Sequence, residues 1–413
     1  MIMRTRNHSG LLLIAAFLVL AIPAGARADN LFRLFPEFQA NGFYGDNIGM
    51  RSSNEIGDFG TTMAAGFFLD YTSEARYAAL HYDTFAQLFL HRTQFDRAGQ
   101  GQSVSAVDDE NLSATTKLHF YDFFYRDAPT EVAVTTSDQS PAFNTVLTQL
   151  LLSNFQQSVN HFSAVLSHAW GRGWTSELSV HQTTFWGNGN NSANGGTTTY
   201  GQGASTTNEY HFTDRFALGA GYRYYDFQFS APGKPDAQAH WPFALANWYP
   251  TKNLYLSGTA GIAITHTQGM GYKENFAGIA LVEYSFHRGH LSIWGGQEPA
   301  LVTAGGGLGK IRGVRGNLVY DITQRLTGSV GGAFENSSGT GFNADLASWG
   351  VGLNQRVNKY VNVYARFVQL RVTETSSNED LIPTAFQNGK QAVGDYYILG
   401  FNVSFEAFRW SWQ

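Results

Sequence analysis

Serine and histidine side chains are the first candidates for chemistry in this chain, because a serine nucleophile beside a histidine base can cleave acyl bonds. Ser167 and His168 are adjacent in a stretch that alternates apolar and polar residues, so their side chains point to opposite faces of a strand. Ser113 and His119 share a face, but six residues of extended chain place them about 20 Å apart. Neither pair can form a dyad. We therefore predict no enzymatic activity and no catalytic residue.

The sequence also contains no motif that is typical of a metal site or of a cofactor site. His266, His287 and His290 are near one another, but turn and strand-end positions explain them without a metal. The chain contains no cysteine, so it has no CxxCH site for haem attachment. The run Gly305–Lys310 has the glycines of a phosphate loop but lacks its full spacing and the following Ser or Thr. We predict no metal site and no cofactor.

The remaining ionisable residues matter because they occur in stretches with a period of two and keep largely to one face. In Trp174–Thr183, for example, Leu178 and Val180 alternate with Glu177 and His181. This alternation indicates strands with one apolar and one polar face. By this parity we assign to a water-facing interior His81, Asp83, Gln87, His91, Lys117, His119, Glu177, His181, Glu283, Arg223, Arg315 and Arg366. Their signs are mixed, which predicts weak ion selectivity; alternatively, these side chains pair with one another and stiffen the wall.

The elements that position these residues are about eighteen strands, joined in turn by short connections and longer Gly/Asn/Ser-rich ones. We expect Gln94–Asp109 to be a long loop and Leu112–Phe124 to be a strand. The weakest predicted strand is Thr130–Thr135. It is needed if tight turns at Arg126–Pro129 and Gly171–Gly173 lie on the same side. Sixteen strands remain the alternative, with two weak segments fused or outside the wall.

The composition agrees with a wall between lipid and water. Aromatic residues make up 15%, glycine accounts for 45 of 413 residues, and only 14% are charged, against about 25% in typical soluble domains. The net charge of −5 argues against a nucleic-acid partner. A closed barrel is one of the two structures that cross lipid with every backbone group paired. We predict an all-β, antiparallel transmembrane β-barrel with short periplasmic turns and longer extracellular loops; a soluble, secreted all-β protein is the alternative.

The N-terminal segment Met1–Ala28 has the pattern of a secretory signal. Arg4 and Arg6 precede an apolar run that ends at Pro23, and a small-x-small site follows at residues 26–28. We therefore expect residues 29–413 to form a single barrel domain in the outer membrane of a Gram-negative cell. After residue 28 no stretch is apolar for 18 residues, which excludes a transmembrane helix from the prediction.

Two segments require separate treatment. Val363, Phe367 and Arg371 share one parity, so keeping both Arg366 and Arg371 in water requires a bulge near Phe367–Val368. Asp138–Gln157 is a long loop whose apolar residues recur at helical spacing. Its helix could fold into the lumen, cap the rim or rest on the outer leaflet. The residues that would form a constriction are Leu147, Leu150, Leu151 and Phe155.

The first predicted strands carry a pattern that spans about the first 60 mature residues. Its elements are Phe43–Asn47 with an Asp-Asn pair, then Asp58, Phe67–Tyr71, and an Arg-led strand from Arg76. With these elements the chain resembles the putative β-barrel porins, a family of exopolysaccharide-associated outer-membrane proteins. The resemblance implies an outer-membrane barrel of unassigned cargo and brings no catalytic residues.

The function expected from these features is passive diffusion of small hydrophilic solutes, or a conduit within an export system. The alternative is a structural sheath or partner barrel for a polysaccharide-export or electron-transfer complex, without transport of its own. The expected partners are the lipid bilayer with its lipopolysaccharide and the barrel-assembly machinery. A periplasmic export or electron-transfer protein would be a further partner under the second reading, and nucleic acid is excluded.

Overall fold

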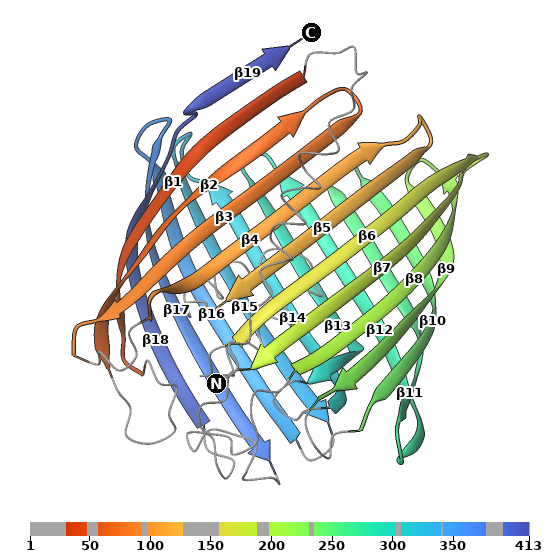
Figure 1. Cartoon of the computed structure of the whole chain (residues 1–413). Helices are drawn as coiled ribbons and strands as arrows, with labels where there is room; N and C mark the ends of the chain where they lie inside the picture. The colour runs from red at the N-terminus through yellow and green to blue at the C-terminus, as the bar shows by residue number, and fades with distance from the viewer. Residues whose placement is uncertain are drawn as a thin grey trace, which may run out of the picture.

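The computed structural model is a closed wall of antiparallel β-strands (Figure 1). It describes residues 30–47, 57–91, 97–126, 157–187, 198–230, 235–302, 307–339, 342–376 and 391–412. The strands are β1 (Asn30–Gly45), β2 (Asp58–Thr72), β3 (Arg76–Phe89), β4 (Arg97–Asn111), β5 (Thr116–Arg126), β6 (Gln157–Gly171), β7 (Trp174–Gly187), β8 (Thr198–Thr213), β9 (Phe216–Phe229), β10 (Ala237–Thr251), β11 (Leu254–Thr267), β12 (Gly271–Phe286), β13 (Gly289–Val302), β14 (Gly307–Asp321), β15 (Leu326–Gly339), β16 (Phe342–Arg356), β17 (Val361–Ser376), β18 (Gln391–Ser404) and β19 (Phe408–Trp412).

The barrel closes because β1 pairs with β2 on one side and with β18 on the other. Every other strand from β2 to β17 pairs with its two neighbours in chain order, so the backbone groups of the wall are paired within the sheet. The predicted antiparallel barrel of eighteen strands is confirmed, with β19 as one short addition. In the described ranges, no helix is both long and apolar enough to cross a membrane.

The short strand β19 continues along β1 after a bulge. Glu37 lies opposite Ser404, whereas Leu34 lies opposite Phe408, so three residues on one side face two on the other. One of those two is Pro36, which has no N–H to give to the ladder and is tolerated at a bulge. β19 and the C-terminus lie at the top of Figure 1.

The connections have two lengths, which distinguish the two ends of the barrel. At the end near β19 the strands are joined by two to four residues, as at 172–173 between β6 and β7. We call this the short-turn end. At the opposite end, the loop end, most connections are longer, for example 46–57 and 127–156. That the short-turn end faces the periplasm remains a prediction.

The predicted count of eighteen strands did not include β4. β4 occupies most of the segment expected to be the loop Gln94–Asp109, and residues 112–115 form its hairpin to β5, where Ser113 N donates to the carbonyl of Thr116 (3.2 Å). The expectation that Arg126 lies on the same side as Gly171–Gly173 is wrong, because β5 ends at the loop end. The rest of the expected turn at Arg126–Pro129 lies outside the described residues. The expected strand Thr130–Thr135 lies outside the described residues. The place beside β5 in the wall belongs to β6.

The two faces of the wall differ sharply in exposure. On β18, Tyr397 and Leu399 are 52% and 64% exposed, whereas Tyr396 and Ile398 are buried. Successive side chains of a strand point to opposite faces, so the exposed set belongs to the outer face. The large exposed aromatic residues near strand ends, such as Trp170, fit an interfacial belt.

The outer face also carries polar groups where the sequence predicted none. The register of β17 with β16 and β18 is continuous, so the expected bulge near Phe367–Val368 is wrong and Arg371 faces outward. Beside it, Gln369 accepts a hydrogen bond from Trp349 Nε1 (2.9 Å) and donates one to Asp395 (2.7 Å). Gln369 is therefore accommodated on the outer face by hydrogen bonds to side chains of the two neighbouring strands.

Candidate functional site on the inner wall

The strand register brings the predicted interior residues to one face, opposite the exposed apolar side chains. The exception is His91, which follows the end of β3 at the loop-end rim and contacts the buried Asp58 (Nδ1 to Oδ1, 2.9 Å). Each of the others takes an inward position, which the pairings define for His81, Asp83 and Gln87 on β3, Lys117 and His119 on β5, Glu177 and His181 on β7, Arg223 on β9, Glu283 on β12, Arg315 on β14 and Arg366 on β17. That they line a conducting path remains a prediction.

The inner face near the short-turn end is polar, and we call this half the polar tier. Glu177 on β7 and Glu209 on β8 are close enough for their charges to repel each other. Asn247 on β10 donates to Glu209 (2.9 Å) and accepts from Ser257 Oγ (2.7 Å). Further charged members on this half of the inner face are Arg33, Asp70, Asp109, Lys117, His119 and Glu283.

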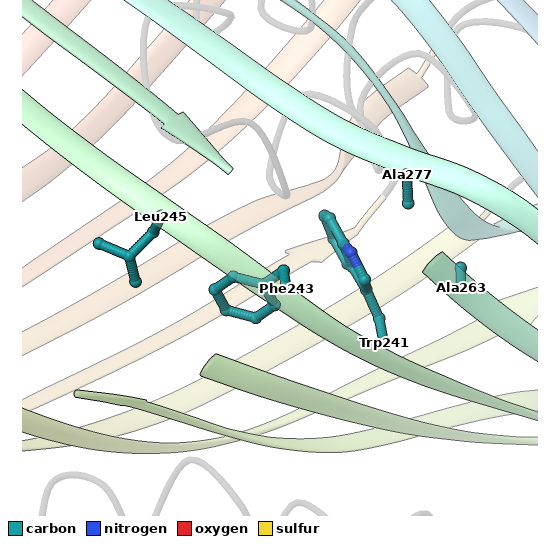
Figure 2. Packing of buried hydrophobic residues seen from close by; sticks show 5 residues of the cluster. All are labelled: Trp241, Phe243, Leu245, Ala263 and Ala277. Atoms are coloured by element: carbon teal, nitrogen blue, oxygen red, sulfur yellow. The ribbon is translucent and has the colours of Figure 1, made fainter. Parts of the chain in front are cut away.

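The inner face toward the loop end is lined by buried apolar side chains, and we call this half the apolar tier. On β10, Trp241, Phe243 and Leu245 pack with Ala263 of β11 and Ala277 of β12 (Figure 2). Trp241 is completely buried. The tier continues around the wall with Phe43, Phe85, Tyr125, Val159, Phe227, Ile311, Leu346, Leu370, Val372, Tyr396 and Ile398, all buried.

A row of charges interrupts the apolar tier. The Arg223 guanidinium lies over the rings of Trp241 (4.9 Å) and Phe243 (5.1 Å). Arg315 on β14 pairs with the buried Glu335 of β15 and lies 5.3 Å from the ring of Trp294. The indole nitrogens of Trp241 and Trp294 have no hydrogen-bond partner among the described residues. Cation–π contacts and ion pairing therefore hold these arginines against the wall.

The same row spans the lumen. Glu298 on β13 is within electrostatic range of both Arg223, four strands away, and Arg315 on the next strand. Val159 of β6 and Phe227 of β9 pack against Leu308 of β14. Contacts between strands so far apart in the wall can be made only across the interior, so the lumen is narrow in this half.

A cluster of three ligating side chains lies beside the barrel closure. His81 Nε2 is 2.9 Å from Glu37 Oε2 and 3.1 Å from Asp83 Oδ2. Glu37 comes from β1, and the other two come from alternate positions of β3, with β2 between the two strands. Ser404 Oγ of β18 donates to the second oxygen of Glu37 (3.2 Å).

Several inward residues escaped the sequence reasoning, among them Glu37, Asp109, Glu209, Glu298 and Glu335. Alternation in the sequence could have placed them on the inner face. Glu37, for example, takes the same face of its strand as Gln39 and Asn41. Asp109 was missed because β4 was read as a loop. The predicted constriction residues Leu147, Leu150, Leu151 and Phe155 lie outside the described residues.

Comparison with known proteins finds likeness in structure only. No protein-family model matches the sequence. No curated protein matches it significantly either. Solved structures similar to the chain include OccK2 (OpdF) of Pseudomonas aeruginosa in complex with glucuronate, with a TM-score of 0.47, 11% identity, and coverage of 91% of this chain and 98% of that one.

Two further similar structures are barrels from the same organism. OpdL has a TM-score of 0.45 and 12% identity, with 91% of this chain and 99% of that one covered. The siderophore receptor PirA has a TM-score of 0.45 and 12% identity, covering 90% and 80%. These neighbours are outer-membrane porins and receptors. The resemblance to the exopolysaccharide-associated group remains a prediction.

Proposed function

We propose that this protein is an outer-membrane channel for the passive diffusion of small hydrophilic solutes. The observation that supports this most is the separation of faces on a closed wall of eighteen strands, with exposed apolar side chains outside and charged ones inside. A barrel of this size has room for an aqueous interior. No constellation for bond cleavage accompanies it among the described inner-wall residues.

The two tiers give the channel a wide and a narrow part. Solutes would cross the polar tier among hydrated charges and then pass the narrower apolar tier beside the row of Arg223, Glu298 and Arg315. Narrow apolar segments disfavour water and large hydrated solutes. We therefore expect an upper size limit set by the loop-end half of the lumen.

Liposome swelling tests the proposal with the full chain. Proteoliposomes placed in iso-osmotic solutions of neutral sugars should swell quickly with a monosaccharide and progressively more slowly with di- and trisaccharides. Protein-free liposomes prepared in parallel set the baseline. Swelling no faster than this baseline for every sugar, from protein that is folded and inserted, would refute the diffusion channel and favour the sheath alternative.

The polar tier should set a weak cation preference. Replacing Glu177 and Glu209 together by glutamine removes two negative charges from the inner face, so the cation-over-anion permeability ratio should fall. The change should stay below about thirtyfold, because each of the two charges contributes only about 1 kcal/mol at 4 Å in water. The measurement is the reversal potential of a planar bilayer under a KCl gradient.

The matched control removes the same charge from the outer face. The register places Glu110 on β4 and Glu274 on β12 outside, so the double variant Glu110→Gln, Glu274→Gln should leave the reversal potential unchanged. An equal shift in both double variants would show that ions do not pass along the inner face.

A further inference from the structure

We propose that Glu37, His81 and Asp83 form a binding site for a divalent first-row transition-metal ion on the inner wall. One atom from each side chain, an imidazole nitrogen or a carboxylate oxygen, lies within 4.8 Å of the other two. Imidazole nitrogen and carboxylate oxygen are both ligands of ions such as Zn²⁺.

Hydrogen bonding alone does not account for the arrangement. Both carboxylates approach the same ring nitrogen of His81, at 2.9 and 3.1 Å. That nitrogen carries at most one hydrogen, so it cannot donate a full hydrogen bond to both acids. Two ligands that are each about 2.1 Å from an ion lie about 3.0 to 3.4 Å apart when they meet it at a right or tetrahedral angle. A small movement of the three side chains would therefore place all of them around one ion.

The charges in the cluster favour a cation. Among the described side chains, neither Glu37 nor Asp83 forms a salt bridge with lysine or arginine. Arg33, the arginine of β1, donates two hydrogen bonds of 2.9 and 2.6 Å to Asp70. Two carboxylates thus share one imidazole, and a divalent ion would neutralise them.

The surroundings hold the three ligands in place. Gly66 on β2 lies directly between Glu37 and Asp83 in the register, and a Cβ there would overlap the backbone carbonyl of Tyr82 first and Asp83 Oδ1 next. The missing side chain lets that carboxylate lie over the strand. Ser404 orients Glu37 by its hydrogen bond, and the ring of Phe68 contacts the His81 ring edge to face (centroids 6.2 Å apart). Such outer-shell contacts orient the ligands of metal sites.

Other histidine–acid pairs on the described chain are simpler and provide controls. His119 has one carboxylate within hydrogen-bond distance, that of Asp109 (2.6 Å), and both side chains face the interior. A single carboxylate and a single imidazole supply two ligands rather than three. With three ligands from the wall at the first site, the remaining coordination positions of the ion would face water in the lumen.

Zn²⁺ binding by the purified full chain in detergent, after chelator treatment, tests the proposal. Titration against a chromophoric competitor should show one site per chain. Each of His81→Ala, Asp83→Asn and Glu37→Gln should weaken binding by at least about tenfold, as loss of a ligand exceeds the effect of an outer-shell change. The control His119→Ala should bind like the unmodified protein. Circular dichroism and heat-modifiable gel migration establish that each variant is folded.

Co²⁺ provides an independent readout, because the position and intensity of its visible absorption change when the ion leaves bulk water for a protein site. The unmodified protein and His119→Ala should show this spectrum, and His81→Ala should not. If the unmodified barrel binds Zn²⁺ no more tightly than His81→Ala, or if His119→Ala loses as much affinity as His81→Ala, the cluster is an ion pair only and the proposal is wrong. Neither result depends on whether the barrel conducts, so these experiments test the metal site independently of the proposed channel.

Discussion

Replacing Thr206 by lysine should destabilise the membrane-inserted barrel by about 2–4 kcal/mol, whereas the same replacement at Thr207 should have almost no effect. The two threonines are consecutive on β8, at the same depth, and point to opposite faces. Thr206 lies opposite Leu178 and Tyr222, both exposed on the outer face. A lysine there would place its charge in lipid.

Thr207 has acidic neighbours on the inner face. It lies opposite Glu177 on β7 and two residues from Glu209. A lysine at this position would relieve the repulsion between the two carboxylates, which offsets the loss of the threonine. Urea-induced unfolding of the protein in phospholipid vesicles measures both variants against the parent. Equal losses of stability, or a larger loss for Thr207→Lys, would contradict the assignment of the two faces.

Arg315→Ala should destabilise the barrel by about 3–5 kcal/mol, the effect expected when one partner of a buried ion pair is removed. Glu335 is 1% exposed and would lose the arginine with which it pairs. The substitution also removes the cation–π contact with Trp294. The same urea titration in vesicles measures the loss.

A double-mutant cycle separates the ion pair from the lost packing. Glu335→Gln alone should also destabilise, and the double variant Arg315→Ala, Glu335→Gln should recover part of the loss because neither charge of the pair remains in the wall. Arg325→Ala, in the exposed turn between β14 and β15, should change stability by less than about 0.5 kcal/mol. A loss below about 1 kcal/mol for Arg315→Ala, or strictly additive losses in the cycle, would show that the pair does not hold the wall.

The fold could be predicted largely from the alternation, because each strand of such a wall meets lipid on one side and a polar interior on the other. β4 was missed because its sequence, rich in Gly, Ser, Gln and Asp, has few apolar outward positions, Val104 and Ala106 among them. The polar, glycine-containing composition of this segment is typical of a loop, and it masks the weak alternation of a strand. The strand expected at Thr130–Thr135 followed from a counting rule: two turns on the same side of a barrel must be separated by an even number of strands.

The site could be predicted only in part, because parity within a strand says which face a side chain takes but not which side chains meet. His81 and Asp83 were assigned to the interior from β3 alone. Their meeting with Glu37 depends on the register of three strands, and the contact of Glu37 with Ser404 joins residues 367 positions apart through closure of the barrel. The division into polar and apolar tiers likewise depends on how far each strand is shifted along its neighbours, and this shift cannot be predicted from the sequence of one strand.

The channel itself is tested most directly by single-channel recording of the purified full chain in a planar lipid bilayer. The proposed function predicts discrete, long-lived open steps with an ohmic current and weak selectivity between K⁺ and Cl⁻. The contradicting result is an electrically silent bilayer when protein of the same preparation is folded, inserted and heat-modifiable. Silence of that kind would identify the barrel as a sheath or structural partner rather than a path for solutes.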